Sequence, residues 1–180
     1  MSGIRKVIPV KPVCAITFIK TLDIKELEIQ LETILGKVDD RSDIYPFSFT
    51  SYYSDEMGKD LMKQFLSFSP CVSPETLPEM KRKTNELEET WSEQGKRQVN
   101  CDPGYLTGSK LVLASTKDFA HRIFLGQGIY GDLQLQYRHN KFWPEAWTFP
   151  DYQTDLALTF FSRIRSRFVR EEYNDQEDKL

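Results

Sequence analysis

The segment between residues 100 and 122 gathers polar side chains of the kinds that bind small molecules and move protons. His121 is a candidate general acid or base, because histidine changes its charge near neutral pH. Asp102 and Asp118 are candidate general bases or ligands of a hard cation. The other candidates are ligand contacts: Lys110, Lys117 and Arg122 for an anion, together with Asn100, Tyr105 and Thr116.

Each of these candidates also has a simpler interpretation. A single histidine beside an arginine is commonly a surface or strand-edge residue. Asp102 precedes Pro103-Gly104, and an aspartate at that place often bonds the backbone of the turn. His139 belongs to a charged turn, where we expect it to be solvated. The hypothesis of a site therefore requires the fold to bring residues 100–122 onto one face.

Two glycine patterns resemble phosphate-binding loops. Residues 126–131 read GQGIYG and match GxGxxG, but the next residues alternate as a strand, whereas a dinucleotide site requires a helix there. We therefore expect a hairpin turn with glycines at positive φ, with phosphate binding as the alternative. Residues 104–111 read GYLTGSKL and lack the P-loop spacing. They still predict a turn leading into a helix N-terminus, which either binds an anion or is an ordinary cap.

No cofactor follows from the sequence, and no metal site is expected. Cys14, Cys71 and Cys101 are widely spaced and form no CxxC pair. Such cysteines suit a reducing cytoplasm better than a disulfide framework.

Composition excludes several classes of protein. The 180 residues carry a net charge of −3, which argues against general nucleic-acid binding. No run approaches the ~20 apolar residues of a membrane span, and the N-terminus has no secretory signal. We expect a cytoplasmic protein with one globular domain over residues 1–173 and a flexible tail over 174–180.

The pattern of apolar residues predicts alternating types of element. Residues 13–19 form a nearly continuous apolar run, typical of a central strand covered on both faces. Asp23 and Ser73 are candidate N-caps of two helices. Further strands are predicted over residues 44–51, 61–69, 121–125, 133–137 and 142–149, a short helix over 107–115 and a last helix from about Thr154.

This order lacks regular strand–helix–strand repetition. It predicts an α+β fold, in which helices pack on one face of a mainly antiparallel sheet. The specific architecture that we expect is a ferredoxin-like core with an added β-hairpin.

Several longer strings resemble one known family. They are YPFSFTSYY (45–53) with EMG (56–58), TNELE (84–88), VNCDPGYL (99–106), KLVLASTKD (110–118), HRI (121–123), Gly126 with GIY (128–130), Tyr137 and WTFPDY (147–152). Together they are similar to the domain-of-unknown-function family 4416, over roughly residues 9 to 170. The resemblance implies a compact cytoplasmic domain from a prokaryote, and it supplies no activity.

Two hypotheses of function remain open. The first is a domain that binds or acts on a phosphorylated or nucleotide-like small molecule through residues 100–122. The second is a non-catalytic module for a protein or RNA partner, which would use aromatic loops around Tyr52-Tyr53 and Trp143–Trp147 and the arginines of the last helix. These aromatic residues could equally cover the end of the core.

Overall fold

The computed structural model describes residues 3, 6–49, 54–58 and 60–177, with side chains as far as residue 171 and apart from those of 54 and 55. The loop predicted around Tyr52-Tyr53 lies outside the described residues. In chain order the elements are β1 (Lys11–Ile19), α1 (Ile24–Leu35), β2 (Lys37–Arg41), β3 (Tyr45–Phe47), α2 (Ser54–Met57), β4 (Leu61–Ser69), η1 (Pro74–Thr76), α3 (Leu77–Thr90), β5 (Ser92–Glu93), β6 (Lys96–Arg97), β7 (Val99–Leu106), β8 (Lys110–Ser115), β9 (Ile123–Gly126), β10 (Ile129–Arg138), β11 (Lys141–Pro144), η2 (Pro150–Gln153) and α4 (Asp155–Glu177).

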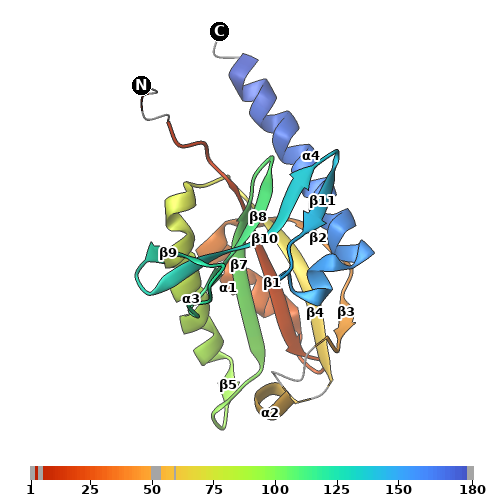
Figure 1. The fold of residues 1–180 in the computed structure, drawn as a ribbon. Helices are drawn as coiled ribbons and strands as arrows, with labels where there is room; N and C mark the ends of the chain where they lie inside the picture. The colour runs from red at the N-terminus through yellow and green to blue at the C-terminus, as the bar shows by residue number, and fades with distance from the viewer. Residues whose placement is uncertain (1–2, 4–5, 50–53, 59, 178–180) are drawn as a thin grey trace.

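Nine of the described strands form one antiparallel sheet, and the class is α+β as predicted. Its main path is β11-β10-β8-β7-β1-β4-β2, while β3 pairs with β4 and β9 pairs with β10 (Figure 1). Along β1-α1-β2-β4-α3-β7 the elements follow a β-α-β-β-α-β order. The ferredoxin-like architecture stays a prediction that rests on this order.

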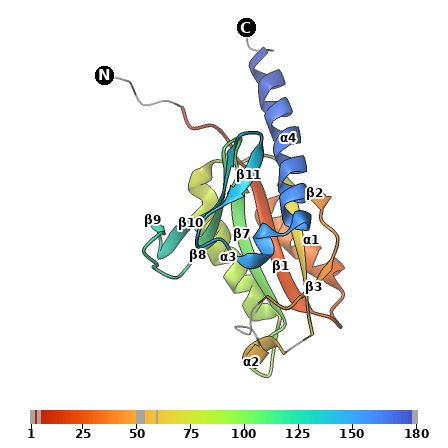
Figure 2. The ribbon, with the colours of Figure 1, turned by 45° about the vertical axis from the view of Figure 1, so that its right-hand side comes forward.

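Helices cover both faces of the sheet (Figure 2). Alternate residues of β1 point to opposite sides, so Ile16 packs in the core beneath α1 and α3, and Ala15 packs in the core beneath α4. The prediction of helices on one face therefore holds for α1 and α3 but does not extend to α4. The reason lies in the stripe of Phe160, Ile164 and Phe168, which needs an apolar surface of its own.

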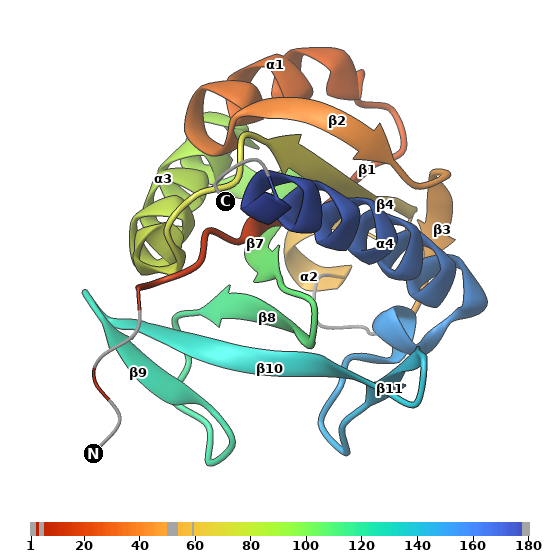
Figure 3. The same ribbon diagram turned by 90° about the horizontal axis from the view of Figure 1, so that it is seen from above.

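The sheet curls around α4 (Figure 3). Seen from above, α4 lies between the edge formed by β4 and β2 and the opposite edge formed by β10 and β11. The helix continues to Glu177, so residues 174–177, which the sequence places in the tail, are helical. Residues 178–180 lie outside the described part of the chain.

Two predicted turns and the strands beside them can be compared with the structure. The predicted helix over residues 107–115 is wrong: residues 110–115 form β8, and Thr107 to Ser109 make the hairpin turn from β7. Residues 111–114 are apolar on consecutive positions because β8 is covered on both faces. The first part of the GxGxxG segment is the predicted hairpin turn, between β9 and β10, with positive φ at Gly126, Gln127 and Gly128, whereas Gly131 lies within β10.

Candidate functional site

The strands β7 and β8 separate partway along their length. They pair from Leu106 and Leu111 as far as Gly104 and Leu113, whereas β7 continues back to Val99 alongside β1 alone. A cavity of about 880 Å³ opens beside this gap. It is lined by Phe47, Phe49, Lys63, Lys81, Asn85, Glu88, Glu89, Arg97, Asn100, Asp102, Ala114, Ser115, Thr116, Lys117, Phe119, Arg122, Phe149, Pro150 and Asp151.

Helix α3 supplies the hydrogen bonds that a neighbouring strand would have made at the gap. The backbone N–H of Cys101 donates to Oε1 of Glu88 at 2.7 Å, and Nζ of Lys81 donates to the Cys101 carbonyl oxygen at 2.8 Å. Buried backbone groups need such partners, and an unpaired one would cost free energy. Two charged side chains of α3 thus satisfy both backbone groups of Cys101 where β7 leaves β8.

Lys81 and Glu88 also interact with each other and with Asp102. Nζ of Lys81 lies 3.4 Å from Oδ1 of Asp102 and 4.0 Å from Oε1 of Glu88. Burial opposes the charged form of Lys81, but the carboxylates of Asp102 and Glu88 outweigh it, so the pKa of Lys81 lies above its usual value. Burial raises the pKa of Glu88, and its contacts with Lys81, Cys101 and Arg97 offset only part of that rise. Lys81 is therefore a protonated donor at neutral pH.

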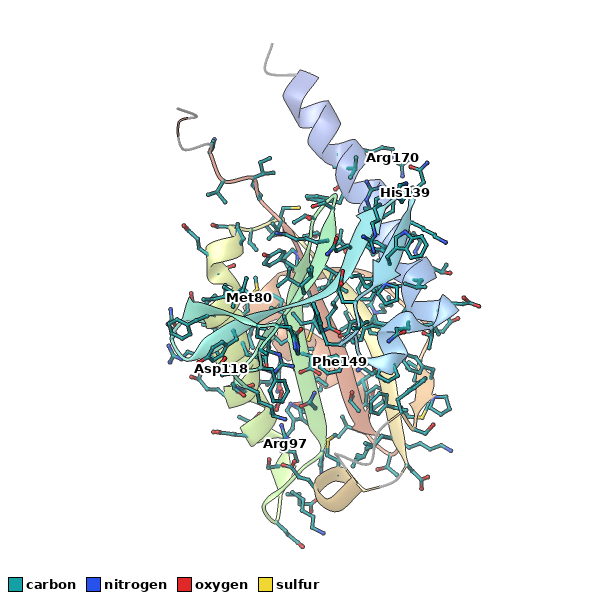
Figure 4. The ribbon with its side chains drawn as sticks, viewed as in Figure 1. Met80, Arg97, Asp118, His139, Phe149 and Arg170 are labelled. Carbon is teal, nitrogen blue, oxygen red and sulfur yellow. The ribbon has the colours of Figure 1, made fainter. Side chains whose placement is uncertain are left out.

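Arg97 closes one end of the cavity. Its Nη1 donates to Oε2 of Glu88 at 2.6 Å, while Nε and Nη2 donate to the two carboxylate oxygens of Glu56 at 2.6 and 2.7 Å. These contacts, that with Glu56 first, raise the pKa of Arg97 further. Figure 4 shows Arg97 at the lower end of the molecule, below Phe149. The guanidinium is thus fixed by two acids in a planar, bidentate arrangement.

Asn100 and Asp102 form the part of the cavity wall that belongs to β7. The amide Nδ2 of Asn100 donates to Oδ2 of Asp102 at 2.9 Å, and Oδ1 of Asn100 faces Nη1 of Arg97 at 3.4 Å. The side chain of Asp102 is 25% exposed, whereas that of Glu88 is 4% exposed. Asp102 is therefore the acid of this group that a ligand can reach, and its oxygens can accept a hydrogen bond or a proton.

A second buried ion pair lies at the β4 side of the cavity. Nζ of Lys63 is 2.7 Å from Oδ2 of Asp151, and both side chains are buried. The ammonium lies 4.7 Å from the ring centre of Phe47, within range of a cation–π contact. Thr17 of β1 lies between Lys63 of β4 and Asn100 of β7 in the sheet. Its buried hydroxyl has no hydrogen-bond partner among the described residues.

Arg122 borders the cavity on the side of β8 and β10. Its Nε and Nη2 contact Oδ2 of Asp132 at 2.8 and 2.7 Å, and Nη1 donates to Oγ of Ser115 at 2.6 Å. The guanidinium also lies 4.5 Å from the ring centre of Phe119. These contacts fix the segment between β8 and β9, which carries Thr116 and Lys117 to the cavity.

Aromatic rings line the cavity together with these charged groups. Phe47 and Phe49 come from β3 and the residues after it, Phe119 from the β8–β9 connection, and Phe149 from the residue before η2. Phe49, Phe119 and Phe149 are exposed by 41%, 51% and 39%. Exposed rings beside a polar pocket can stack on a flat ligand group.

One comparison with known proteins covers most of the fold. A family model described as "Domain of unknown function (DUF4416)" matches residues 8–168. The chain belongs to this family. No curated protein and no solved structure gives a significant match. Within the family match lie both sides of the β7–β8 gap and all the residues of the cavity.

Five of the nine residues chosen from the sequence of this family member lie together in the structure. They are Asn100, Asp102, Thr116, Lys117 and Arg122, all of which line the cavity. Their roles in binding or catalysis stay predictions. They meet because β7 carries Asn100 and Asp102 to the gap, while the chain leaving β8 carries the other three to its opposite side.

The two other candidates for proton transfer do not line the cavity. His121 stacks on Trp147, with ring centres 4.8 Å apart, and its Nε2 lies 3.5 Å from Oδ1 of Asp132. Asp118 is exposed on the loop after β8, where Figure 4 shows it at the side of the molecule. His121 and Arg122 both lie beside the carboxylate of Asp132, but only Arg122 lines the cavity.

The two remaining candidates lie elsewhere in the fold. Tyr105 packs against the core on the side of α1 and α3. Lys110 is exposed at the start of β8, at the end opposite the gap, and Thr107 caps the turn before it by accepting from the N–H groups of Ser109 and Lys110. Because no helix begins here, the structure does not support the anion site that the sequence predicts at a helix N-terminus.

The candidates chosen from the sequence do not include several charged residues that form ion pairs at the cavity, among them Lys63, Lys81, Glu88, Arg97 and Asp151. The sequence does carry a signal for two of them. Lys81 and Glu88 occupy the same helical stripe as Leu77 and Thr84, at spacings of three and four, so their side chains must face the core. A charged residue at such a position is rarely buried without a partner, which marks both as unusual.

Two further findings concern the part of the chain that the structure describes. No three of its histidine, cysteine, aspartate and glutamate side chains gather closely enough to hold a metal ion. No helix within it is both long and apolar enough to cross a membrane.

Proposed function

We propose that the cavity beside the β7–β8 gap binds a phosphorylated or nucleotide-like small molecule, on which the protein acts or which it senses. The observation that supports this proposal most strongly is the convergence of cationic side chains from separate elements. Lys63 comes from β4, Lys81 from α3, Arg97 from β6 and Arg122 from the segment before β9. Burying charges is costly, and although Lys81 also bonds the Cys101 carbonyl oxygen, a ligand site would account for the gathering of all four cations at one cavity.

The size and walls of the cavity suit such a ligand. Its volume of about 880 Å³ falls in the range of about 300–1,000 Å³ typical of small-molecule sites. Phe49, Phe119 and Phe149 offer faces on which a heterocyclic base could stack. Lys63 and Lys81 are buried, whereas these rings are exposed, so the charged end of the ligand would point inward.

The charged residues of the cavity would have different roles, which follow from their ion pairs. Arg97 and Arg122 are held by Glu56, Glu88 and Asp132, so they would stay in place without a ligand and contribute mainly a fixed field. Lys81 and Lys117 would contact the anionic group. Asp102 would accept a hydrogen bond from a ligand hydroxyl, or its proton if the bound molecule reacts.

A ligand screen by thermal unfolding and calorimetry tests this proposal. The panel contains nucleoside mono- and triphosphates, ribose 5-phosphate and inorganic phosphate, each with and without Mg²⁺. At a hundredfold excess over Kd a ligand should stabilise the protein by about 2.7 kcal/mol. Asp102→Asn and Lys117→Ala should each weaken the binding tenfold or more, while Lys110→Ala, at the far end of β8, should bind as the wild type does.

Two results would contradict the proposal. One is a full panel without any binding, measured on protein whose unfolding is cooperative. The other is a ligand whose affinity falls equally in Lys110→Ala and in the two cavity variants, because that would place the ligand elsewhere.

A cytoplasmic location is part of the same proposal. Cys14 and Cys101 are free thiols buried in the core. Free thiols of this kind suit the reducing cytoplasm, where phosphorylated metabolites are abundant. Fractionation of cells that produce the chain would test this location directly.

The second candidate function is a non-catalytic module for a protein or RNA partner. It is favoured by the exposed apolar side chains of β9, where Ile123 and Phe124 are 73% and 59% exposed. RNA binding would weaken steeply as salt is raised, because phosphate contacts release counterions. Absence of such binding at low salt would leave a protein partner as the form of this alternative.

A further inference from the structure

Strand β9 is an apolar edge of the sheet. It consists of Ile123, Phe124, Leu125 and Gly126, and the first three are exposed by 73%, 59% and 42%. It pairs with β10 on one side, through Gly126, Phe124 and Ile123, and no described strand pairs with its other side. Figures 1 and 2 show the β9 hairpin projecting sideways from the body of the molecule.

The other edges of the sheet carry protection that β9 lacks. Four of the five residues of β2 are charged, from Lys37 to Arg41. The edge strands β3 and β11 contain Pro46 and Pro144, which cannot donate to a further strand. Charges and prolines of this kind prevent a free edge from pairing with another chain. The four residues of β9 include neither, so this edge is suited to accept a strand.

We propose that β9 pairs antiparallel with β9 of a second copy of this chain, which joins the two sheets across a twofold axis. The strand has no charged side chain, so two copies meet without repulsion between like charges. The antiparallel direction brings Arg122 of one copy toward the Gly126–Gln127 end of the other, whereas a parallel pair would set the two Arg122 residues side by side. An isologous contact of this kind closes after two copies.

The position of the hairpin makes such a pair accessible. Because β9 lies at the margin of the molecule in all three ribbon views, a second copy can approach it from outside (Figure 3). Phe119 and Arg122, which line the cavity, lie just before β9 in the chain. The second copy would therefore sit beside one wall of the cavity. The inference is independent of what the cavity binds.

The oligomeric state of the full chain tests the inference. Sedimentation velocity over a wide range of protein concentration should reveal a monomer–dimer equilibrium. Ile123→Lys, at the most exposed position of the strand, should shift that equilibrium to monomer by tenfold or more. Ile29→Lys is the matched control, because Ile29 is 64% exposed on α1 and lies away from β9. Thermal unfolding confirms that both variants are folded.

A distance measurement identifies the interface. A spin label at Phe124→Cys, in a Cys71→Ser background, should give one short distance between labels in the dimer, whereas a label at Ile29→Cys should give a long one. The inference is overturned by a wild-type protein that stays monomeric at every concentration. It is overturned equally by a dimer that survives Ile123→Lys, or by labels at Phe124→Cys that lie far apart.

Discussion

The carboxylate of Glu88 accepts the backbone N–H of Cys101 at 2.7 Å and thereby takes the place of a strand partner. The same side chain accepts from Nη1 of Arg97 at 2.6 Å. One residue of α3 therefore secures both the free side of β7 and the arginine at the end of the cavity.

Replacement of Glu88 should be costly. Glu88→Ala removes the partner of Cys101 and Arg97 and leaves the charge of Lys81 less compensated, so the free energy of unfolding should fall by about 3 kcal/mol. The neighbouring Glu89→Ala, at an exposed position, should change it by about 0.5 kcal/mol or less. Urea unfolding measures the free energy of unfolding of both variants, and an unchanged m-value shows that only the stability has changed. Equal losses in the two variants would contradict the role of Glu88 at the gap.

The Lys63–Asp151 pair should behave as a buried unit. Lys63→Met leaves the carboxylate of Asp151 buried without its ammonium and should cost about 3–5 kcal/mol. The double variant with Asp151→Leu should regain most of that loss, because no buried charge then remains. As a control, Lys83→Met breaks the exposed pair with Glu79 and should cost about 0.5 kcal/mol. A double variant as unstable as Lys63→Met would show that the pair is not coupled.

Gly104 stands where β7 and β8 make their last paired contact. A Cβ at this position would press on the carbonyl oxygen of Val112 and come within 2.7 Å of the Leu113 side chain, so Gly104→Ala should destabilise the protein by about 1–3 kcal/mol. Gly108→Ala, whose Cβ would meet Val169 at 3.5 Å, should be close to neutral. Thermal unfolding compares the two. An unaffected Gly104→Ala variant would mean that the strands can separate earlier than the structure indicates.

Acid should weaken the contact between α4 and β2. Burial opposes ionisation of Asp40, but its bonds to Arg163 outweigh this and hold its pKa below the usual 3.8. A carboxyl group whose pKa is lower in the folded state stabilises that state at pH values above its usual pKa. This stabilisation disappears as the pH falls through the pKa of the folded state. Asp40→Asn should therefore lose up to about 1 kcal/mol at neutral pH, and nothing relative to wild type well below pH 3.8. Unfolding by urea at several pH values measures this.

Much of the fold follows from local sequence features. The uninterrupted apolar run of β1 correctly predicts a strand covered on both faces, and the side chains of Asp23 and Ser73 cap their helices by accepting from Lys25 and Glu75. The sequence correctly predicts a hairpin turn at Gly126 and Gly128, because the alternation after them is incompatible with a helix. The stripe of Phe160, Ile164 and Phe168 correctly predicts the last helix, though not the face of the sheet that it covers.

The remainder depends on contacts that no short segment contains. Residues 111–114 of β8 are apolar on both sides, so they have no periodicity that separates a strand from a helix. The cavity depends on where β7 leaves β8, a property of pairing across the sheet. Asn100 and Arg122 could be chosen for their chemistry, but Lys63 and Asp151 come from distant elements and meet only in three dimensions.

The partner of Cys101 also affects how this part of the sheet exchanges with solvent. Along most of β7 and β1, amide hydrogens are protected by the neighbouring strand, and they open when the sheet opens. The amide of Cys101 is shielded by a carboxylate on α3. Its exchange with deuterium therefore reports the docking of a helix, and slow exchange there would mean that α3 stays in place on the timescale of hours.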